Sequence, residues 1–313
     1  MRIIEAISND RVGVNHCKQE LGVFVFVRLC TAGLLEQATQ LNDPRGLSSA
    51  GRSGALSLLE VIAAKVEALN TSAYEPTVES SLATAANVLG SSAADAGRVE
   101  QESVATRVES VVDTLSKVQL RDAVEGEARK EVVAGALDLL TQKFAAENFG
   151  TAAVVLLDGA QVNLSQSVPL EDGAQFGSLV VASFRRNGYP SSYNNTGSLS
   201  VRVRGASGRE LRVSGLDDQP VRLSVPTDYP GDRVTCMFWN TSEGNWSTRG
   251  VKTLGRLPGG GIACETTHLT TFTIAEGVSL KVNTFAGSDV RAGAFSTSNP
   301  VMVFTTGCIL LYI

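Results

Sequence analysis

Apolar residues recur every three or four positions through most of residues 51–150, which is the spacing of helices that bury one face. The apolar stripes lie at residues 55–69, 78–89, 104–118 and 133–144. Pro76 stands just before the second stripe, where a first helical turn accepts proline. The pattern predicts a helical subdomain of three or four packed helices over residues 51–150.

From residue 151 the apolar positions change to the two-residue alternation of half-buried strands. The segment SLSVRVRG places Leu199, Val201 and Val203 on one face and polar residues on the other. Further short apolar runs follow, separated by Gly, Pro and Asp. They predict an antiparallel β-sandwich over residues 151–285. Helices followed by strands indicate an α+β fold.

The last residues, 301–313, are apolar and uncharged. A membrane span needs about 20 such residues. We therefore expect residues 301–313 to begin a transmembrane helix in a chain cut at both ends, after a juxtamembrane linker over residues 286–300. A C-terminal core strand is the alternative. Residues 1–50 stay unassigned, and the opening segment lacks the features of a signal peptide.

Composition adds mainly exclusions. The chain has 313 residues, of which 43% are hydrophobic and 19% charged, and its net charge is −5; these values are ordinary for a globular protein. No basic block or basic–aromatic stripe occurs, so we expect no nucleic-acid partner. The GGG at residues 259–261 lacks the lysine of a phosphate-binding loop and predicts a hairpin turn. No motif indicates a cofactor.

Glycosylation sequons favour a secreted or extracellular setting, in which Cys236 and Cys264 would be oxidised. The five cysteines include no C-x-x-C pair, so no zinc knuckle or redox pair is indicated. A zinc site from Cys236, Cys264 and His268 would lack a fourth ligand, and we expect no metal. The N-x-S/T sequons lie at Asn70, Asn163, Asn194, Asn240 and Asn245.

One of the two histidines, His268, lies in the strand-like segment CETTHLTTF. Along a strand His268 and Thr270 share a face, about 7 Å apart at Cα, and a kink would bring the imidazole to the hydroxyl. A histidine base can activate a threonine hydroxyl near neutral pH. The nearest electrophile is the Leu269 carbonyl, and attack there would replace the amide by an ester that water cleaves. The spacing suits self-cleavage, although a histidine in a strand is usually structural.

The surrounding residues resemble the GPS motif, the GPCR proteolysis site that ends a GAIN domain. The similarity spans residues 235–277, in the segments CMFWN, GNWSTRGV and GIACETTHLTTF. The helical part followed by a sandwich agrees with the two subdomains of a GAIN domain. The matching positions are Cys236, Phe238 and Trp239, then Trp246, Ser247 and Gly250, then Cys264, His268, Leu269, Thr270 and Phe272.

The resemblance assigns a role to each of these positions. It implies catalysis by His268, Leu269 and Thr270 and structural roles for the aromatic residues and Gly250. The family usually has four cysteines, and here Val251 and Thr266 stand at two of these positions. If the first cysteine pairs with the third, Cys236 and Cys264 form the surviving disulfide.

The resemblance also implies a function. The protein would be a membrane-proximal ectodomain, on the extracellular side of a plasma or ciliary membrane, that cuts itself once between Leu269 and Thr270. It would stay bound to its own C-terminal fragment, without being an enzyme in the multiple-turnover sense, and its extracellular ligand is unknown. Ala275 and Glu276 interrupt the apolar run typical of tethered agonists, which favours a polycystin-like protein.

Three alternatives remain. The first is an adhesion G-protein-coupled receptor ectodomain with a tethered agonist. The second is the same fold without cleavage, serving as a structural or adhesion module. The third is a protease acting in trans through Thr270, which is disfavoured because a strand buried in its own sandwich leaves no substrate cleft.

Overall fold

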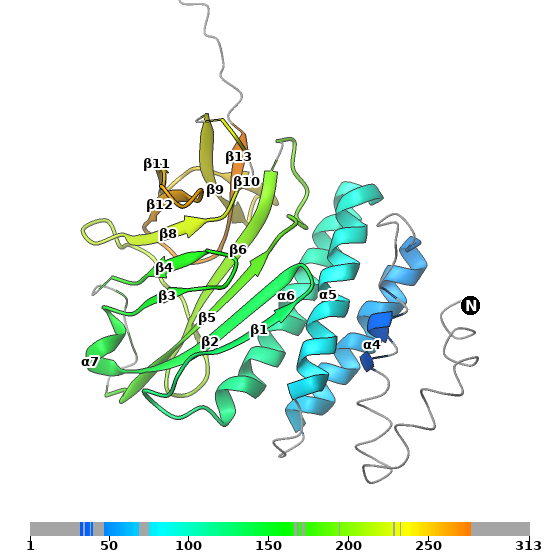
Figure 1. Cartoon of the computed structure of the whole chain (residues 1–313), viewed down its shortest axis with the longest axis horizontal. Coiled ribbons are helices and arrows are strands. Elements are labelled where there is room, and N and C mark those ends of the chain that lie inside the picture. The colour runs from blue at the N-terminus through cyan, green and yellow to red at the C-terminus, as the bar shows by residue number, and fades with distance from the viewer. Residues whose placement is uncertain are drawn as a thin grey trace, which may run out of the picture. The chain divides into compact units, whose positions relative to one another are not determined.

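The computed structural model describes residues 47–68, 75–165, 173–193, 195–227 and 233–276, together with positions 32–33, 35–37, 39, 168, 170 and 229–231. Within these residues a helical region precedes antiparallel sheets (Figure 1). This order confirms the expected α+β fold. The helices with described bounds are α4 (Ser49–Ala68), α5 (Glu75–Asp95), α6 (Arg98–Arg121) and the short α7 (Ala146–Phe149).

The described strands form two antiparallel sheets. The larger sheet has the order β1-β2-β5-β6-β13-β9-β10, with β7 paired to β6, and the smaller has the order β11-β12-β8-β4-β3. The strands are β1 (Lys130–Ala134), β2 (Leu137–Ala145), β3 (Ala153–Val155), β4 (Gln161–Asn163), β5 (Phe176–Phe184), β6 (Asn195–Arg204), β7 (Glu210–Leu211), β8 (Val221–Val225), β9 (Val234–Asn240), β10 (Asn245–Ser247), β11 (Val251–Arg256), β12 (Ile262–Thr266) and β13 (Thr271–Glu276).

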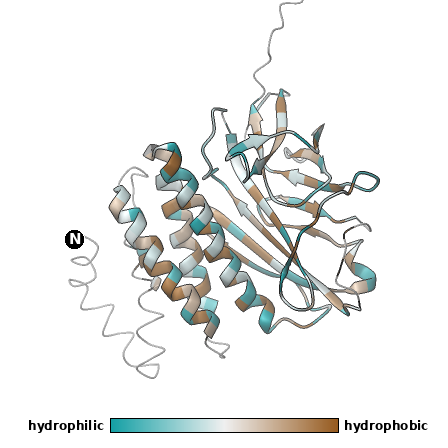
Figure 2. Ribbon diagram, turned by 180° about the vertical axis from the view of Figure 1, so that it is seen from behind, coloured by the Kyte–Doolittle hydropathy of each residue, from teal (hydrophilic) through white to brown (hydrophobic). Residues whose placement is uncertain are grey.

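The larger sheet is buried on both faces. Helices α5 and α6 contact one face and α4 packs on both helices, while the smaller sheet covers the other face (Figure 1). Neighbouring residues of one strand therefore enter different cores: Leu139 packs with the helices and Leu140 packs inside the sandwich. Figure 2 shows hydrophobic positions running along the strands of this sheet beside the helices. The site described below lies within this doubly covered sheet.

The helix expected over residues 133–144 is wrong, because these residues form the hairpin of β1 and β2. Ala134 pairs with Leu137 across a turn in which Gly135 has a φ of 61°, a conformation that glycine adopts at little cost. Strand β2 is buried on both faces at its start, so its apolar residues do not alternate. A short apolar run of this kind cannot be distinguished from a helix by periodicity.

The expected transmembrane segment at residues 301–313 and the linker at residues 286–300 lie outside the described residues. Among the residues that are described, no helix is both long and apolar enough to cross a membrane.

Candidate functional site

His268, Leu269 and Thr270 lie in the connection between β12 and β13, where the chain passes from the smaller sheet to the larger one. The fully buried Thr266 shapes this turn. Its hydroxyl donates a hydrogen bond to the His268 carbonyl at 2.8 Å and lies 3.3 Å from the His268 amide, which donates to it. A threonine that bonds the backbone two residues on in this way stabilises a local turn. The chain therefore bends at the residues where the proposed approach of His268 to Thr270 needs a kink in the strand.

The His268 imidazole packs in an aromatic setting. Its ring meets Phe238 edge-on, with centroids 4.3 Å apart and planes at 76°, and lies 6.1 Å from the ring of Phe272. This burial lowers the pKa of His268 below its usual value, because desolvation disfavours the charged imidazolium. A neutral imidazole keeps one unprotonated nitrogen at neutral pH, which is the state a general base requires.

Gly250 provides the close approach that the histidine needs. Its φ is 74°, and a Cβ added there would lie 2.7 Å from Thr267 Oγ1 and 3.3 Å from His268 Nδ1. The Gly250 carbonyl accepts a hydrogen bond from the Thr267 amide at 3.0 Å. Both the left-handed backbone and the lack of space therefore require glycine at this position.

The peptide bond between Leu269 and Thr270 is fixed on both sides by the backbone. The Leu269 amide donates to the Val213 carbonyl at 3.1 Å, and the Thr270 carbonyl accepts from the Val201 amide at 3.0 Å. The Leu269 side chain packs, partly buried, against the core of the sandwich. These contacts restrict the motion of the two residues between which cleavage is expected.

The two side chains expected to react are not joined through the buried ring nitrogen. Nε2 of His268 makes no hydrogen bond to any described residue, so it does not accept a proton from Thr270 Oγ1 in this structure. Catalytic hydrogen bonds are often absent from resting structures and form only along the reaction. The roles of His268, Leu269 and Thr270 therefore remain predictions.

Strand β13, which begins one residue after Thr270, is an interior strand. It pairs with β6 through partners such as Thr271 and Ser200, and with β9 through partners such as Ile274 and Cys236. Phe272 and Ile274 are fully buried and each contributes about 2 kcal/mol by burial. None of these contacts depends on the bond between Leu269 and Thr270.

The disulfide implied by the resemblance is present. Cys236 of β9 and Cys264 of β12 are bonded, with their Cα atoms 6.1 Å apart, and so link the two sheets. Val251 and Thr266 are cross-strand partners in β11 and β12. The two positions at which the family usually has its other cysteines are therefore neighbours here.

The motif aromatics divide between the two faces of β9. Phe238 contacts His268, whereas Trp239 belongs to the core shared with the helices. Tyr189 stacks on Trp239 at 4.4 Å, and Trp246 lies 5.4 Å from Trp239. Trp239 and Trp246 are thus packing residues between the sheet and the helices.

The expected glycosylation positions have different environments. Asn163 and Asn245 are exposed and Asn240 is half-buried, whereas Asn70 and Asn194 lie outside the described residues. In the described ranges, no group of three or more His, Cys, Asp or Glu side chains is placed to hold a metal ion.

Sequence reasoning missed two neighbours of the peptide between Leu269 and Thr270. Val213 provides the acceptor for Leu269, and Thr266 provides the hydroxyl that forms the turn. Thr266 had been interpreted only as the position of a lost cysteine. The C-x-T-x-H spacing was a usable signal, because threonine two residues before a bend often bonds the backbone.

The comparison with protein families agrees with this region. Residues 137–275 match the family model described as GPS, GAIN subdomain B. The match begins at the first residue of β2 and ends within β13. No curated protein matches the chain. The family match supports a GAIN/GPS domain, an autoproteolytic module typical of membrane-proximal extracellular regions.

Proposed function

We propose that this chain is a membrane-proximal ectodomain module that cuts itself once between Leu269 and Thr270 and keeps both fragments associated. The observation that carries the proposal is the turn at His268. A half-buried imidazole with a lowered pKa lies two residues from Thr270, at a peptide bond fixed on both sides by backbone hydrogen bonds. The family match over residues 137–275 gives independent support.

The proposed reaction needs only residues of this chain and one water molecule. The His268 imidazole takes the proton of Thr270 Oγ1, and the oxygen attacks the Leu269 carbonyl carbon to form a tetrahedral intermediate. The carbon–nitrogen bond breaks as the imidazolium returns the proton to the Thr270 nitrogen, which leaves an ester. Water then hydrolyses the ester to a Leu269 carboxylate and a free Thr270 with its hydroxyl and α-amine.

The reaction would occur once in each molecule. After the cut, Thr270 would be the first residue of the fragment that contains β13, an interior strand whose two neighbours, β6 and β9, stay paired to it. An interior strand offers no cleft for a second substrate. The C-terminal fragment is therefore the partner that we propose for the N-terminal one.

We further propose a polycystin-like setting on the extracellular side of a membrane, with an adhesion-type receptor as the alternative. Glu276 is exposed and ends β13, so the apolar run expected of a tethered agonist stops there. The gene sequence following Ile313 tests this. Six further spans with an extracellular-loop domain would indicate a channel half, and a seven-span bundle would indicate a receptor.

A non-cleaving structural module is the second candidate. The observation that favours it is that His268 Nε2 has no hydrogen-bond partner among the described residues. Expression through a secretory pathway separates the two functions on a denaturing gel. Two fragments split at Leu269–Thr270 are expected, and a single intact wild-type band would support the non-cleaving module.

The matched variants identify the residues. His268→Ala and Thr270→Ala should each give one band, whereas Thr248→Ala, at an exposed threonine in the loop before β11, should still give two. Normal cleavage of His268→Ala would show that His268 is not the base, although the chain would still cleave itself.

A further inference from the structure

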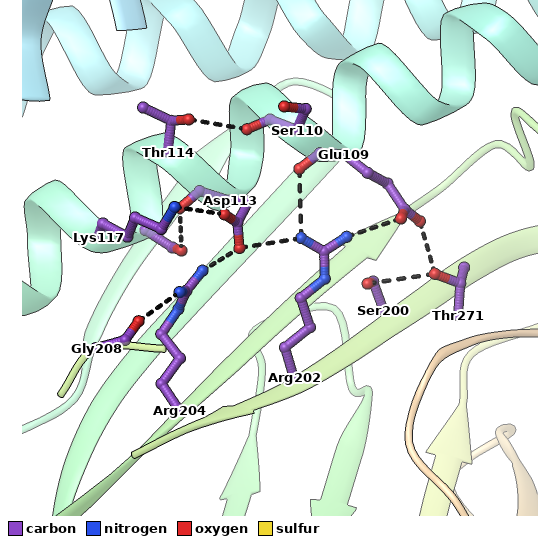
Figure 3. Close-up of polar contacts among 11 residues, drawn as sticks. Glu109, Ser110, Asp113, Thr114, Lys117, Ser200, Arg202, Arg204, Gly208 and Thr271 are labelled. Carbon is purple, nitrogen blue, oxygen red and sulfur yellow. Dashed lines mark hydrogen bonds and ion pairs between the residues drawn. The ribbon is translucent and has the colours of Figure 1, made fainter. Parts of the chain in front are cut away.

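The residue directly after Thr270 is bonded to the helical region. Thr271 Oγ1 donates a hydrogen bond of 2.6 Å to Glu109 Oε1 of α6, across 162 positions of sequence (Figure 3). Thr271 is buried, with 4% of its surface exposed, and its Oγ1 also lies 3.3 Å from Ser200 Oγ of β6. A buried hydrogen bond to a carboxylate is stronger than one between neutral groups.

Glu109 is itself held in place by β6. Arg202 Nη2 lies 2.7 Å from Glu109 Oε2, and Arg202 Nη1 lies 3.2 Å from Asp113 Oδ1, one helical turn further along α6. Arg204 donates a second ion-paired contact to Asp113. Figure 3 shows the two arginines of β6 reaching the two carboxylates of α6.

The ion pairs are shielded from water. The side chains of Arg202 and Glu109 are only 16% and 17% exposed. Burial acts to lower the pKa of Arg202, but Glu109, Glu210 and Asp113 together raise it above its usual value. Low exposure strengthens such pairs relative to surface ones. The Glu109 carboxylate is thus a fixed acceptor, and the first residue of β13 is bonded to it.

The neighbouring threonine shows that this anchor is specific to position 271. Thr273 lies on the same face of β13 and is also fully buried. Its hydroxyl donates to the Gly197 carbonyl at 2.8 Å, within the same sheet. Thr273 therefore fixes β13 to its sheet, whereas Thr271 fixes the beginning of β13 to α6.

We propose that Glu109 is a positioning residue for self-cleavage and acts through the Thr271 hydroxyl. Attack of Thr270 Oγ1 on the preceding carbonyl requires the backbone of residue 270 to be held in one geometry. A misplacement of about 1 Å can reduce a rate by about 100-fold. By fixing residue 271, the contact between α6 and β6 makes the cleavage rate depend on the helical region. This inference rests on the proposed function.

The test compares cleavage rates of the full chain by pulse-chase in a secretory expression system. Thr271→Val removes the hydroxyl at nearly constant volume and should slow cleavage by about 10- to 100-fold. Thr271→Ser restores the hydroxyl and should restore the rate. Glu109→Gln keeps an acceptor but loses the ion pair with Arg202, and it should also slow cleavage.

Thr273→Val is the matched control, because it removes one buried hydroxyl from the same face of the same strand. The thermal midpoint of each variant is measured in a Thr270→Ala background, where no cleavage interferes. The proposal expects Thr273→Val to lower this midpoint as Thr271→Val does, while its cleavage rate stays within about twofold of the wild type.

Each other outcome overturns the proposal. A wild-type cleavage rate in Thr271→Val would show that cleavage does not need the hydrogen bond between Thr271 and Glu109. Equal slowing in Thr271→Val and Thr273→Val would show that the effect comes only from a general loss of stability. If Thr271→Val fails to fold, the cleavage rates of Thr271→Ser and Glu109→Gln provide the test. Normal cleavage of Glu109→Gln then overturns the proposal. An uncleaved wild type would instead remove the proposed function, and this inference with it.

Discussion

The ring of Phe238 covers the edge of the His268 imidazole, with centroids 4.3 Å apart. Phe238 lies in β9 and His268 in the connection between β12 and β13, and the two meet because β9 pairs with β13 directly after the turn that carries His268. The burial that lowers the pKa of His268 therefore includes a residue 30 positions earlier in the chain. Phe238 therefore contributes to the burial of the proposed base as well as to the packing of the core.

Phe238→Ala should expose the imidazole and raise the pKa of His268 toward its ordinary value of about 6.5. The self-cleavage rate should fall at the same time, since the ring loses its packing partner. The pKa is measured by NMR titration of the imidazole protons in a Thr270→Ala background. Phe144→Ala, which removes a half-buried aromatic from β2, is the control and should leave the titration of His268 unchanged.

The lowered pKa of His268 also predicts a pH dependence of stability. The unfolded chain binds a proton at His268 at higher pH than the folded chain does, so the free energy of unfolding rises with pH between the folded and unfolded pKa values. The stabilisation is complete above the unfolded value of about 6.5 and is lost as the pH falls through the folded value.

Urea unfolding of Thr270→Ala and of the double variant His268→Ala/Thr270→Ala, from pH 7 downwards, measures this effect. The difference in unfolding free energy between the two proteins should shrink as the pH falls. A difference that does not depend on pH would contradict the assigned burial of His268. Groups that titrate in both proteins cancel in the comparison.

Gly250→Ala should prevent cleavage and destabilise the domain. The variant adds the strain of a positive φ, about 1–2 kcal/mol, and places a methyl group against Thr267 and the imidazole. The control is Gly208→Ala, where φ is 77° but no atom of the described residues, chain neighbours aside, lies within 4 Å of the added Cβ. Gly208→Ala should show similar strain in urea unfolding yet still give two bands on a denaturing gel.

The disulfide should stabilise the domain without holding the fragments together. Cys236 and Cys264 both precede Leu269, so a denaturing gel without reductant should still resolve the two fragments. The double variant Cys236→Ala/Cys264→Ala should lose about 3 kcal/mol of stability, measured by urea unfolding in the Thr270→Ala background. A single band that splits only after reduction would show that a bridge crosses the cleavage point.

The sequence contained enough to predict the helices up to residue 121, the strands after residue 151 and the bridge between Cys236 and Cys264. The prediction failed at β1 and β2, because β2 is buried on both of its faces. Its residues Leu137, Leu139 and Leu140 are all buried, so the strand lacks the alternation that marks a half-buried strand. Only the glycine of the hairpin, Gly135, indicated a turn there.

The candidate site was only partly predictable for a different reason. His268, Leu269 and Thr270 are adjacent in sequence, so local spacing was enough to propose them. The groups that hold this segment in place are distant in sequence. Val213, which accepts from Leu269, lies 56 residues before it, and Glu109, which accepts from Thr271, lies 162 residues before it. Contacts at such separations depend on the order of strands in the sheet, which the alternation of apolar residues does not specify.

The interior position of β13 determines how the strand would leave the sheet under load. A pull on Glu276 along the strand axis would load the ladders to β6 and β9 in shear, so that many backbone hydrogen bonds bear the force together. A strand at the edge of a sheet could instead be peeled away one bond at a time. Because forced separation follows the unfolding rate, this geometry favours a cleaved strand that stays in place until the whole sheet opens.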